Sequence, residues 1–505
     1  MTSGIHHVTL ITRNVQANID FYAGFLGLRL VKQTGGYEDG EQLHLFYGDA
    51  LGSPGSLITF LVWENGAAGR VGHGQVAEIA LAVPVETIGD WLTRSLSSQI
   101  RIEGPKREFG EPVLRLKDPD GITVKLVGRD MPAAHSWGNA PTRLHSVTIL
   151  TETQEETAAF ITRFGYQPSQ TEDNILRLAS ETDFIDVRNV TGFVPGIPGT
   201  GIADHIAFRA PDVAAVKTAQ AELSRLNSSA TNFHDRNYFT SLYVREPGGT
   251  LIELATDGPG FTIDEPPEHL GETLFVPPHN KERAEDLRVL MPQFSMPDKE
   301  RIVMRDLPFV HRFYTPEQPD GSTILLLHGT GGNEADLMPM AHRINPHATL
   351  LGLRGRSHEE GVARWFRRFG ATQFDQTDIR TEAEAFNAFM EGAASAYGIK
   401  PEKTTILGYS NGANFAAAIM ALYPHLIHSA ILCRPMQVLE TSPQVDLSAA
   451  RVLTLTGNQD PYGRFAASLN IWLKECAADL TAELLDAGHQ LTPEDTAKAQ
   501  QWLKI

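Results

Sequence analysis

Residues 201–261 open with GIADHIAFRAPDV (201–213) and close with HDRNYFTSLYVREPGGTLIELATDGPGF (234–261). The opening predicts a short apolar strand that carries His205, and the run GGTLIEL predicts a second strand that carries Glu253. A carboxylate in an apolar strand is costly to bury unless a cation or a hydrogen-bonding partner meets it. Alone, this pair is weak evidence for a site, because buried structural pairs of this kind are common.

The same pattern recurs through the first half of the chain. Four segments each read as a strand, an amphipathic helix and then further strands, at about residues 5–63, 76–127, 144–190 and 203–256. In the first helix, Val15, Ile19, Tyr22 and Leu26 recur at helical spacing. A stretch rich in Pro, Ala and Gly separates the second segment from the third. The sequence therefore predicts four βαβββ modules in an α+β domain.

The repeat aligns candidate ligands. First strands place four residues at equivalent positions: His7, Glu78, Ser146 and His205. Last strands do the same for Thr59, Lys125, Asp186 and Glu253. Two histidines and a carboxylate form the facial triad of non-haem Fe(II) sites, which leaves coordination positions open. We predict a metal in one cup, formed by modules one and four, with ligands His7, His205 and Glu253. Modules two and three offer no histidine at a ligand position, so their cup looks degenerate.

The four-module layout resembles the vicinal-oxygen-chelate superfamily of glyoxalases, bleomycin-resistance proteins and extradiol dioxygenases. In that superfamily, paired modules close a cup of strands around a metal. The motifs HDRNYF, YVREPGG, IELATDGPGF and DEPPEHLGETLFVPP are similar to those of ring-cleaving dioxygenases that act on hydroquinones. The resemblance covers about residues 1–295. It implies an aromatic substrate, O₂ and Fe(II), and the sequence does not distinguish Fe(II) from Mn(II).

The resemblance also implies roles around the metal. Arg236 would stabilise an anionic oxygen and Tyr243 would donate or accept a proton, which suits a bound phenolate. The structural alternatives are a surface salt bridge and a core aromatic residue. His6 would lie near the substrate, although neighbours on a regular strand face opposite ways. Thr9 faces the cup, and Asp204 stands where relatives carry histidine, which bears on proton handling and substrate preference. We therefore expect both residues to contribute to the substrate-binding site.

From residue 301 onward, strand-like runs alternate with helical ones, beginning with IVMRDL (302–307). This alternation predicts a mostly parallel sheet with helices on both faces. The run TTILGYSNGANFAAAIMAL (404–422) reads as a strand, a G-x-S-x-G turn and an Ala-rich helix. That context is the one required of a nucleophile elbow, here at Ser410. No long insertion for a lid is evident, so we expect an open site for modest acyl groups.

The other catalytic groups follow in α/β-hydrolase order, Ser…Asp…His. Asp460 would orient His489, which takes the proton of Ser410 as its oxygen attacks an acyl carbon. Backbone N–H groups of Thr330 and Asn411 would form the oxyanion hole. The alternative is an inactive hydrolase in which these are ordinary loop residues. The motifs LHGTGGNE, GYSNG, GNQDPY and AGHQ resemble small carboxylesterases and phospholipases over about 302–505.

The length, composition and net charge of the chain exclude some classes of protein. The 505 residues carry 43 basic and 61 acidic side chains, a net charge of −18, which argues against nucleic-acid or anionic-membrane surfaces. We see no signal-peptide pattern and no apolar run of roughly 20 residues. Cys433 and Cys476 lie outside any CxxC motif, which argues against a disulfide framework and fits the cytoplasm. Cys433 reads as a core residue. The oligomeric state is left open, and a homodimer is compatible with it.

We therefore predict a bifunctional enzyme, with a ring-cleaving dioxygenase at 1–296 and a serine carboxylesterase for small acyl esters at 297–505. One alternative for the first half is a glyoxalase-like lyase or isomerase. Such sites usually take a fourth protein ligand, and Thr59, which stands at that position, argues against it. The other alternative is a non-catalytic module that binds quinones or drugs, fused to an active esterase.

Overall fold

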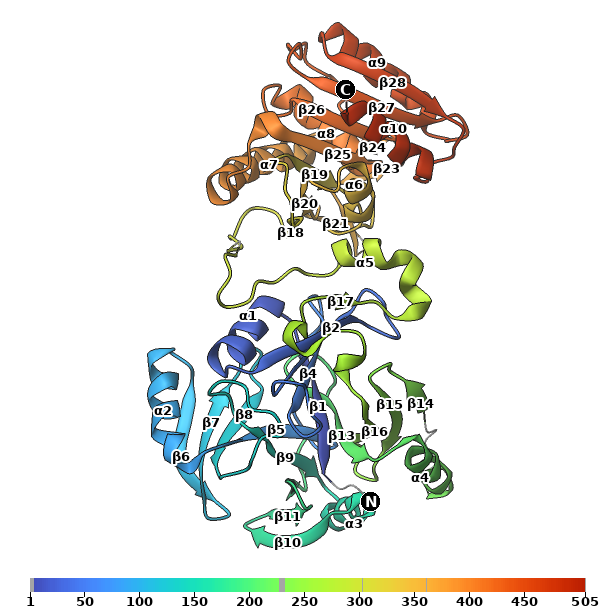
Figure 1. The fold of residues 1–505 in the computed structure, drawn as a ribbon. Coiled ribbons are helices and arrows are strands. Elements are labelled where there is room, and N and C mark those ends of the chain that lie inside the picture. The colour runs from blue at the N-terminus through green and yellow to red at the C-terminus, as the bar shows by residue number, and fades with distance from the viewer. Residues whose placement is uncertain (1–3, 227–231, 302, 360, 505) are drawn as a thin grey trace. The chain divides into compact units, whose positions relative to one another are not determined.

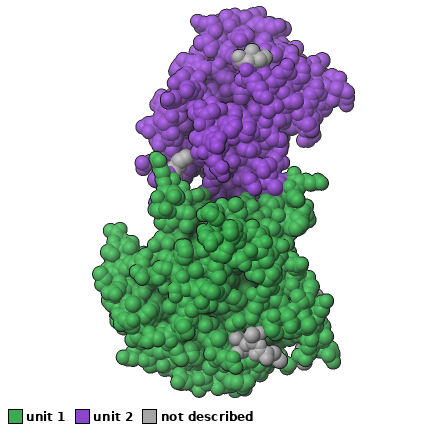
Figure 2. Space-filling view, in the orientation of Figure 1, with its two compact units in different colours: residues 1–282, 294–300 green, residues 283–293, 301–505 purple. Residues whose placement is uncertain are grey.

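The computed structural model describes residues 4–226, 232–301, 303–359 and 361–504. The chain forms two compact units, coloured separately in Figure 2. Unit 1 contains residues 1–282 and 294–300, and unit 2 contains residues 283–293 and 301–505. The short helix α5 (Ala284–Leu290) lies inside the range 1–296 predicted for the dioxygenase but is grouped with unit 2. A functional boundary near Met296 stays a prediction.

Modules one and four share a nine-stranded sheet, ordered β14-β15-β16-β13-β1-β4-β3-β2-β17. At its centre β1 (Ile5–Thr12) pairs antiparallel with β13 (Ala203–Ala210), and both strands are labelled in Figure 1. The parallel partner of β1 is β4 (Leu57–Val62), and that of β13 is β16 (Leu251–Pro259). The outer strands are β2 (Arg29–Gly35), β3 (Leu43–Gly48), β14 (Asn232–Asp235), β15 (Phe239–Arg245) and β17 (Leu274–Phe275).

Modules two and three share an eight-stranded sheet, ordered β10-β11-β12-β9-β5-β8-β7-β6. Its central strands are β5 (Gln75–Val83) and β9 (Arg143–Thr151). The others are β6 (Ile102–Glu108), β7 (Glu111–Lys117), β8 (Thr123–Gly128), β10 (Gln167–Glu172), β11 (Ile175–Ala179) and β12 (Phe184–Asn189). The two sheets give the paired-module architecture that the repeat predicts.

Strand register agrees with the alignment of the modules. In each module, the aligned residue of the last strand pairs with the residue two positions beyond the aligned residue of the first strand. These pairs are Thr9–Thr59, Ala80–Lys125, Thr148–Asp186 and Ala207–Glu253. The predicted helix of each module follows its first strand: α1 (Val15–Ile19) with a π-helical turn (Asp20–Phe25), α2 (Ile88–Ser97), α3 (Gln154–Ile161) and α4 (Val213–Leu226).

The segment after β16 closes one side of the first cup. Phe261 and Leu270 pack into the apolar core between its strands. The buried ammonium of Lys32 lies 2.8 Å from a carboxylate oxygen of Asp264 and 2.6 Å from one of Glu265. Strand β17 then adds to β2 at the sheet edge. Paired charges and apolar burial together hold this tail in place.

Unit 2 is built on a seven-stranded sheet, ordered β18-β20-β19-β25-β26-β27-β28, in which β18 (His311–Tyr314) is antiparallel and the rest are parallel. The parallel strands are β19 (Thr323–Leu327), β20 (Thr349–Leu353), β25 (Thr404–Tyr409), β26 (Ser429–Cys433), β27 (Arg451–Gly457) and β28 (Asp479–Leu485). Their side chains alternate between two cores. Leu325 and Leu327 face α7 (Gln376–Tyr397), α8 (Asn411–Leu422) and α9 (Ala466–Glu475). Ile324 and Leu326 face α6 (Met338–Ile344) and α10 (Pro493–Leu503).

One expectation for unit 2 is corrected. Residues 303–307 form no strand, because β18 already occupies that edge of the sheet; Ile302 lies outside the described residues. The expectation that no long insertion forms a lid stays a prediction, because the elements found in this region are short. Between β20 and α7 the chain forms two short hairpins, β21 (Ser357–Glu359) with β22 (Val362–Arg364), and β23 (Arg368–Gly370) with β24 (Gln373–Phe374). Across the described segments, no helix has the length and apolar character needed to cross a bilayer.

Candidate metal centre and hydrolase triad

Three buried side chains meet inside the first cup: His7 on β1, His205 on β13 and Glu253 on β16. The oxygen Oε2 of Glu253 lies 3.1 Å from Nε2 of His7 and 2.8 Å from Nε2 of His205. The two histidine nitrogens are 3.3 Å apart. Around an octahedral ion with bonds of about 2.1 Å, adjacent ligand atoms lie about 3.0 Å apart. The three distances therefore fit one face of an octahedron.

The charge of this group also fits a cation. Burial raises the pKa of Glu253, but His7 and His205 hold that pKa well below its usual range. Its oxygen Oε1 accepts a hydrogen bond from the hydroxyl of Ser241. Its oxygen Oε2 accepts no well-directed hydrogen bond from any described residue. A buried carboxylate oxygen without such a bond, facing two imidazoles, is suited to a metal ion.

Both histidines are held through their other ring nitrogen. Nδ1 of His205 lies 2.7 Å from a carboxylate oxygen of Asp204, and Nδ1 of His7 lies 2.9 Å from Nδ1 of His6. Burial lowers the pKa of His205, but the nearby carboxylates of Asp204 and Glu253 raise it to about 9. Burial lowers the pKa of His6 to about 3, so this ring is neutral and can accept a hydrogen bond from His7. Such outer contacts set the orientation of metal-binding histidines.

β-Bulges explain how adjacent residues reach one site. Along the β1–β13 ladder the register shifts between Ile5 and His7 and again where Thr9 pairs with His205. These shifts leave His6 and Asp204 without a direct partner across the ladder. A bulge re-aims the side chain of the extra residue. Both residues were predicted to lie near substrate; the structure places them against the two histidines, and contact with substrate stays a prediction.

Arg236 and Tyr243 lie on the same cup. The ring centroids of Tyr243 and His205 are 5.4 Å apart, and the Arg236 guanidinium lies 5.7 Å from the Tyr243 centroid. Burial lowers the pKa of Arg236, but Tyr243 and the exposed Glu38, at 3.2 Å, raise it overall. Arg236 is therefore a cation held beside the phenol, and it is accessible at the edge where Glu38 lies.

Two residues that the sequence analysis did not single out also line this cup. His44 on β3 places Nε2 2.9 Å from the hydroxyl of Thr59, which lies 2.8 Å from the hydroxyl of Thr9. Ser241 occupies the position on β15 that matches His44 on β3, because the neighbouring ladders have the same register. Thr59 thus has two polar partners within the protein. Extending the alignment to the middle strands would have identified both residues.

The second cup contains cationic side chains where the first gathers metal ligands. The ammonium of Lys125 lies 3.2 Å from Glu78 and 3.4 Å from Glu108. Arg177 donates two hydrogen bonds to Asp186, of 2.7 and 2.9 Å. Among the described residues, only the first cup brings three potential ligands together. The degenerate character expected for the second cup has a simple cause, since its carboxylates are already neutralised.

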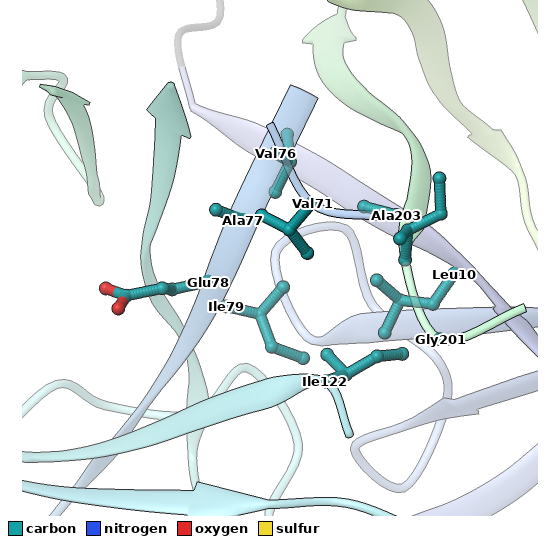
Figure 3. A pocket seen from close by; sticks show the side chains of 10 residues that line it. Leu10, Val71, Val76, Ala77, Glu78, Ile79, Ile122, Gly201 and Ala203 are labelled. Carbon is teal, nitrogen blue, oxygen red and sulfur yellow. The ribbon is translucent and has the colours of Figure 1, made fainter. Parts of the chain in front are cut away.

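A small hollow of about 10 Å³ lies between β1, β5 and β13. Figure 3 shows its apolar lining, including Leu10, Val76 and Ile122, with the carboxylate of Glu78 pointing away from them. Such a volume holds about one water molecule. It includes none of the predicted site residues, so we assign it no function.

In unit 2 the predicted triad is assembled. The hydroxyl of Ser410 lies 3.0 Å from Nε2 of His489, and Nδ1 of His489 lies 2.9 Å from a carboxylate oxygen of Asp460. Ser410 has φ of 50°, in the turn that joins β25 to α8. A Cβ on Gly408 would come within 2.8 Å of Ala413 Cα, and one on Gly412 would come within 2.0 Å of a backbone oxygen. Both glycines are therefore required by close backbone approach.

Of the two predicted oxyanion residues, Asn411 directly follows this serine, and both contact the segment at the first short hairpin. Asn411 is the first residue of α8, where backbone N–H groups lack acceptors within the helix. Its side-chain oxygen accepts a hydrogen bond of 2.9 Å from the backbone N–H of Trp365. Arg364 donates a hydrogen bond of 3.3 Å to the hydroxyl of Thr330. Sequence periodicity could not indicate these contacts, because strands of three residues carry no period.

Known proteins match each unit. Residues 4–126 match the Glyoxalase/Bleomycin resistance protein/Dioxygenase superfamily, and residues 311–505 match the Phospholipase/Carboxylesterase family. MhqO of Bacillus subtilis (strain 168), by name a candidate ring-cleaving dioxygenase, is 36% identical over 55% of this chain and 91% of its own length. MhqD of the same strain, by name a candidate hydrolase, is 34% identical over 36% of this chain and 92% of its own length. The chain belongs to both families.

Two further comparisons concern unit 1. The chlorohydroquinone/hydroquinone 1,2-dioxygenase of Sphingobium indicum is 31% identical over 54% of this chain and 91% of its own length. A crystal structure of a candidate dioxygenase from Bacillus subtilis subsp. subtilis str. 168 is 33% identical, with a TM-score of 0.57, and covers 59% of this chain and 98% of that one. The family of unit 1 uses a metal, and the chain joins a dioxygenase-type unit to a hydrolase-type unit.

Proposed function

We propose that unit 1 is an Fe(II)-dependent, extradiol-type dioxygenase that cleaves the ring of a hydroquinone or related dihydroxy aromatic compound. We propose also that unit 2 is a serine carboxylesterase for small acyl esters. The face of three ligand atoms formed by His7, His205 and Glu253 carries the first proposal. Similarity to a chlorohydroquinone/hydroquinone dioxygenase supports the substrate class. The same donor set also suits Mn(II).

When bound, Fe(II) would supply the electron transfer that allows O₂ to react with an electron-rich ring. The protein's own groups bind and orient that ring. Arg236 would attract a phenolate oxygen through a charge-assisted hydrogen bond. Burial and the nearby carboxylate of Glu253 raise the pKa of Tyr243, so its phenol keeps its proton and donates to an anionic oxygen. His7, His205 and Glu253 would hold the metal through three positions, and such a triad would leave coordination positions open for substrate and O₂.

In unit 2, Asp460 holds the Nδ1–H of His489, which leaves Nε2 to accept the proton of Ser410. The Ser410 oxygen then attacks the acyl carbon of an ester. The developing negative charge on the carbonyl oxygen is met by backbone N–H groups at Asn411 and Thr330. The alcohol leaves with the proton from His489, and water releases the acyl group by the same steps in reverse.

Single substitutions should remove one activity and leave the other. His205→Ala should remove the bound metal and abolish oxygen uptake with hydroquinones, while hydrolysis of aryl acetates continues. Ser410→Ala should have the opposite effect and should lose labelling by serine-directed phosphonates. Each variant serves as the folded control for the other. Full oxygen uptake by His205→Ala would overturn the metal assignment, and binding of quinones without metal or turnover would favour a sequestering module.

The order of the two reactions can be read from products. Feeding the dioxygenase substrate to the wild type and to Ser410→Ala places the esterase downstream if the final products differ. If only an ester precursor fails to support oxygen uptake in Ser410→Ala, the esterase acts upstream. Identical behaviour of both proteins in both assays would exclude a metabolic link between the units.

A further inference from the structure

A buried arginine of unit 2 contacts the backbone on both sides of the triad histidine. Nε of Arg434 donates a hydrogen bond of 2.8 Å to the carbonyl oxygen of Gly488, and Nη2 donates one of 3.0 Å to that of Gln490. Nη1 donates to the carbonyl of Leu455 at 3.3 Å. The residue between the two loop carbonyls is His489. One planar group therefore fixes the peptide units that flank the catalytic ring.

The same guanidinium forms a two-point ion pair with Asp495 on α10. Nη1 lies 2.6 Å and Nη2 3.0 Å from its two carboxylate oxygens, and both side chains are fully buried. Together with the three carbonyls, this gives an acceptor to each of the five N–H bonds of the guanidinium. Asp495 also accepts hydrogen bonds from the backbone N–H and the hydroxyl of Thr492, of 2.8 and 2.9 Å. Apart from the contact with Leu455 on β27, these contacts lead to the loop between β28 and α10 or to the first turn of α10.

That loop is joined to the one that carries the triad aspartate. The N–H of Gln459 donates to the carbonyl of Ala487 at 3.0 Å. A Cβ on Gly457 would come within 2.5 Å of the carbonyl oxygen of Gly488, so the two loops approach each other closely. The histidine loop is thus bound on one side to the aspartate loop and on the other to Arg434.

We propose that Arg434, charge-balanced by Asp495, is a positioning residue for His489 in addition to Asp460, which holds the ring through Nδ1. The inference rests on the proposed esterase triad and adds to it a group that touches neither substrate nor reacting atoms. Burying a cation this deeply costs desolvation free energy, which is offset only when an ion pair and hydrogen bonds satisfy all of its donors. Misplacement of a catalytic group by about 1 Å can slow a reaction about a hundredfold. The five hydrogen bonds of Arg434 therefore serve to keep Nε2 of His489 at 3.0 Å from the hydroxyl of Ser410.

The test removes the pair without leaving a buried charge. Arg434→Met/Asp495→Leu replaces both groups by apolar side chains, an exchange that buried ion pairs often tolerate. The matched control is Arg356→Met/Glu382→Leu, which removes another two-point pair of unit 2, with hydrogen bonds of 2.9 and 2.9 Å. Active serines are counted in each full-length protein by phosphonate titration run to completion. The acylation rate with p-nitrophenyl acetate is then expressed per titrated serine.

We expect the acylation rate per site to fall about 10- to 100-fold in Arg434→Met/Asp495→Leu, with little change in KM, and to stay within twofold of wild type in the control. Loss of folded molecules alone would reduce the number of titrated sites and leave the rate of each unchanged, which would overturn the proposal. If the double variant does not fold, Arg434→Lys provides the test. A lysine ammonium cannot reach both loop carbonyls as a planar fork does. An unchanged rate per site in folded Arg434→Lys would refute positioning by Arg434, whereas failure of wild type to label at Ser410 would refute the triad itself.

Discussion

Replacing Asp204 by Asn should weaken metal binding in the first cup about tenfold without removing the site. Asp204 accepts a hydrogen bond from Nδ1 of His205 at 2.7 Å. An asparagine side chain would keep an oxygen acceptor of the same size at the same place but would lose the negative charge. The substitution should therefore change only the strength of the hydrogen bond that orients the His205 ring.

The magnitude follows from that bond. A hydrogen bond to a charged group contributes about 1.5–3 kcal/mol, and one between neutral groups about 0.5–1.5 kcal/mol. The difference is therefore at most about 2.5 kcal/mol, and solvent screens part of it because the Asp204 side chain is 34% exposed. A loss of about 1.4 kcal/mol remains, which corresponds to about tenfold in the dissociation constant. This value lies at the lower end of the range of about 10- to 100-fold seen when outer contacts of metal ligands are removed.

The measurement is an anaerobic titration of Fe(II) against a competing chelator. Asp257→Asn is the matched control, because Asp257 lies on β16 beyond Glu253 but pairs with Arg209 at 2.8 Å. We expect the control to bind within twofold of wild type and His205→Ala to lose the metal. An Asp204→Asn protein that binds as tightly as wild type would refute the idea that this carboxylate supports the ligand. Complete loss of metal would make Asp204 a ligand in its own right.

Three further outcomes are expected. Tyr243→Phe should keep one metal per chain while oxygen uptake falls by roughly two to four orders of magnitude; loss of metal would place the phenol in the wrong role. Lys125→Met should leave the metal content unchanged and lower the free energy of unfolding by about 1–3 kcal/mol, because Glu78 and Glu108 lose their shared partner, and thermal unfolding with metal analysis checks both. Burial raises the pKa of Asp118 to about 7, so the stability it contributes is present below pH 4 and is lost as the pH rises through 7. The advantage in melting temperature of Asp118→Asn over wild type should therefore grow from pH 5 to pH 8, and a constant difference would argue against the raised pKa.

The modules and the triad were accessible from sequence because each depends on a repeated or ordered pattern. Strand and helix periodicity placed His205 and Glu253 on the first and last strands of module four, and the repeat added His7. Ser410 was evident because its turn needs glycines on both sides. These features are local, and a single sequence carries them.

The contacts around the sites depend on details that periodicity does not encode. His6 and Asp204 reach His7 and His205 because bulges interrupt the alternation of β1 and β13. His44 lies on a middle strand that the alignment did not cover. Arg434 followed a strand in a run that suggested only a buried core. In each case the position of the side chain is decided by a partner distant in the sequence.

The pairing of β1 with β13 has a consequence for how the protein folds during its synthesis. His7 and His205 are separated by 198 positions along the chain, and Glu253 is made later still. A ribosome will have synthesised more than half of the polypeptide before the third ligand leaves the exit tunnel. A nascent first module carries only one of the three potential metal ligands, and long-range strand pairing is slow compared with the formation of local helices. Metal should therefore bind late, after most of unit 1 has been synthesised. The metal content of the protein in a cell would then measure the fraction of molecules in which unit 1 has folded completely.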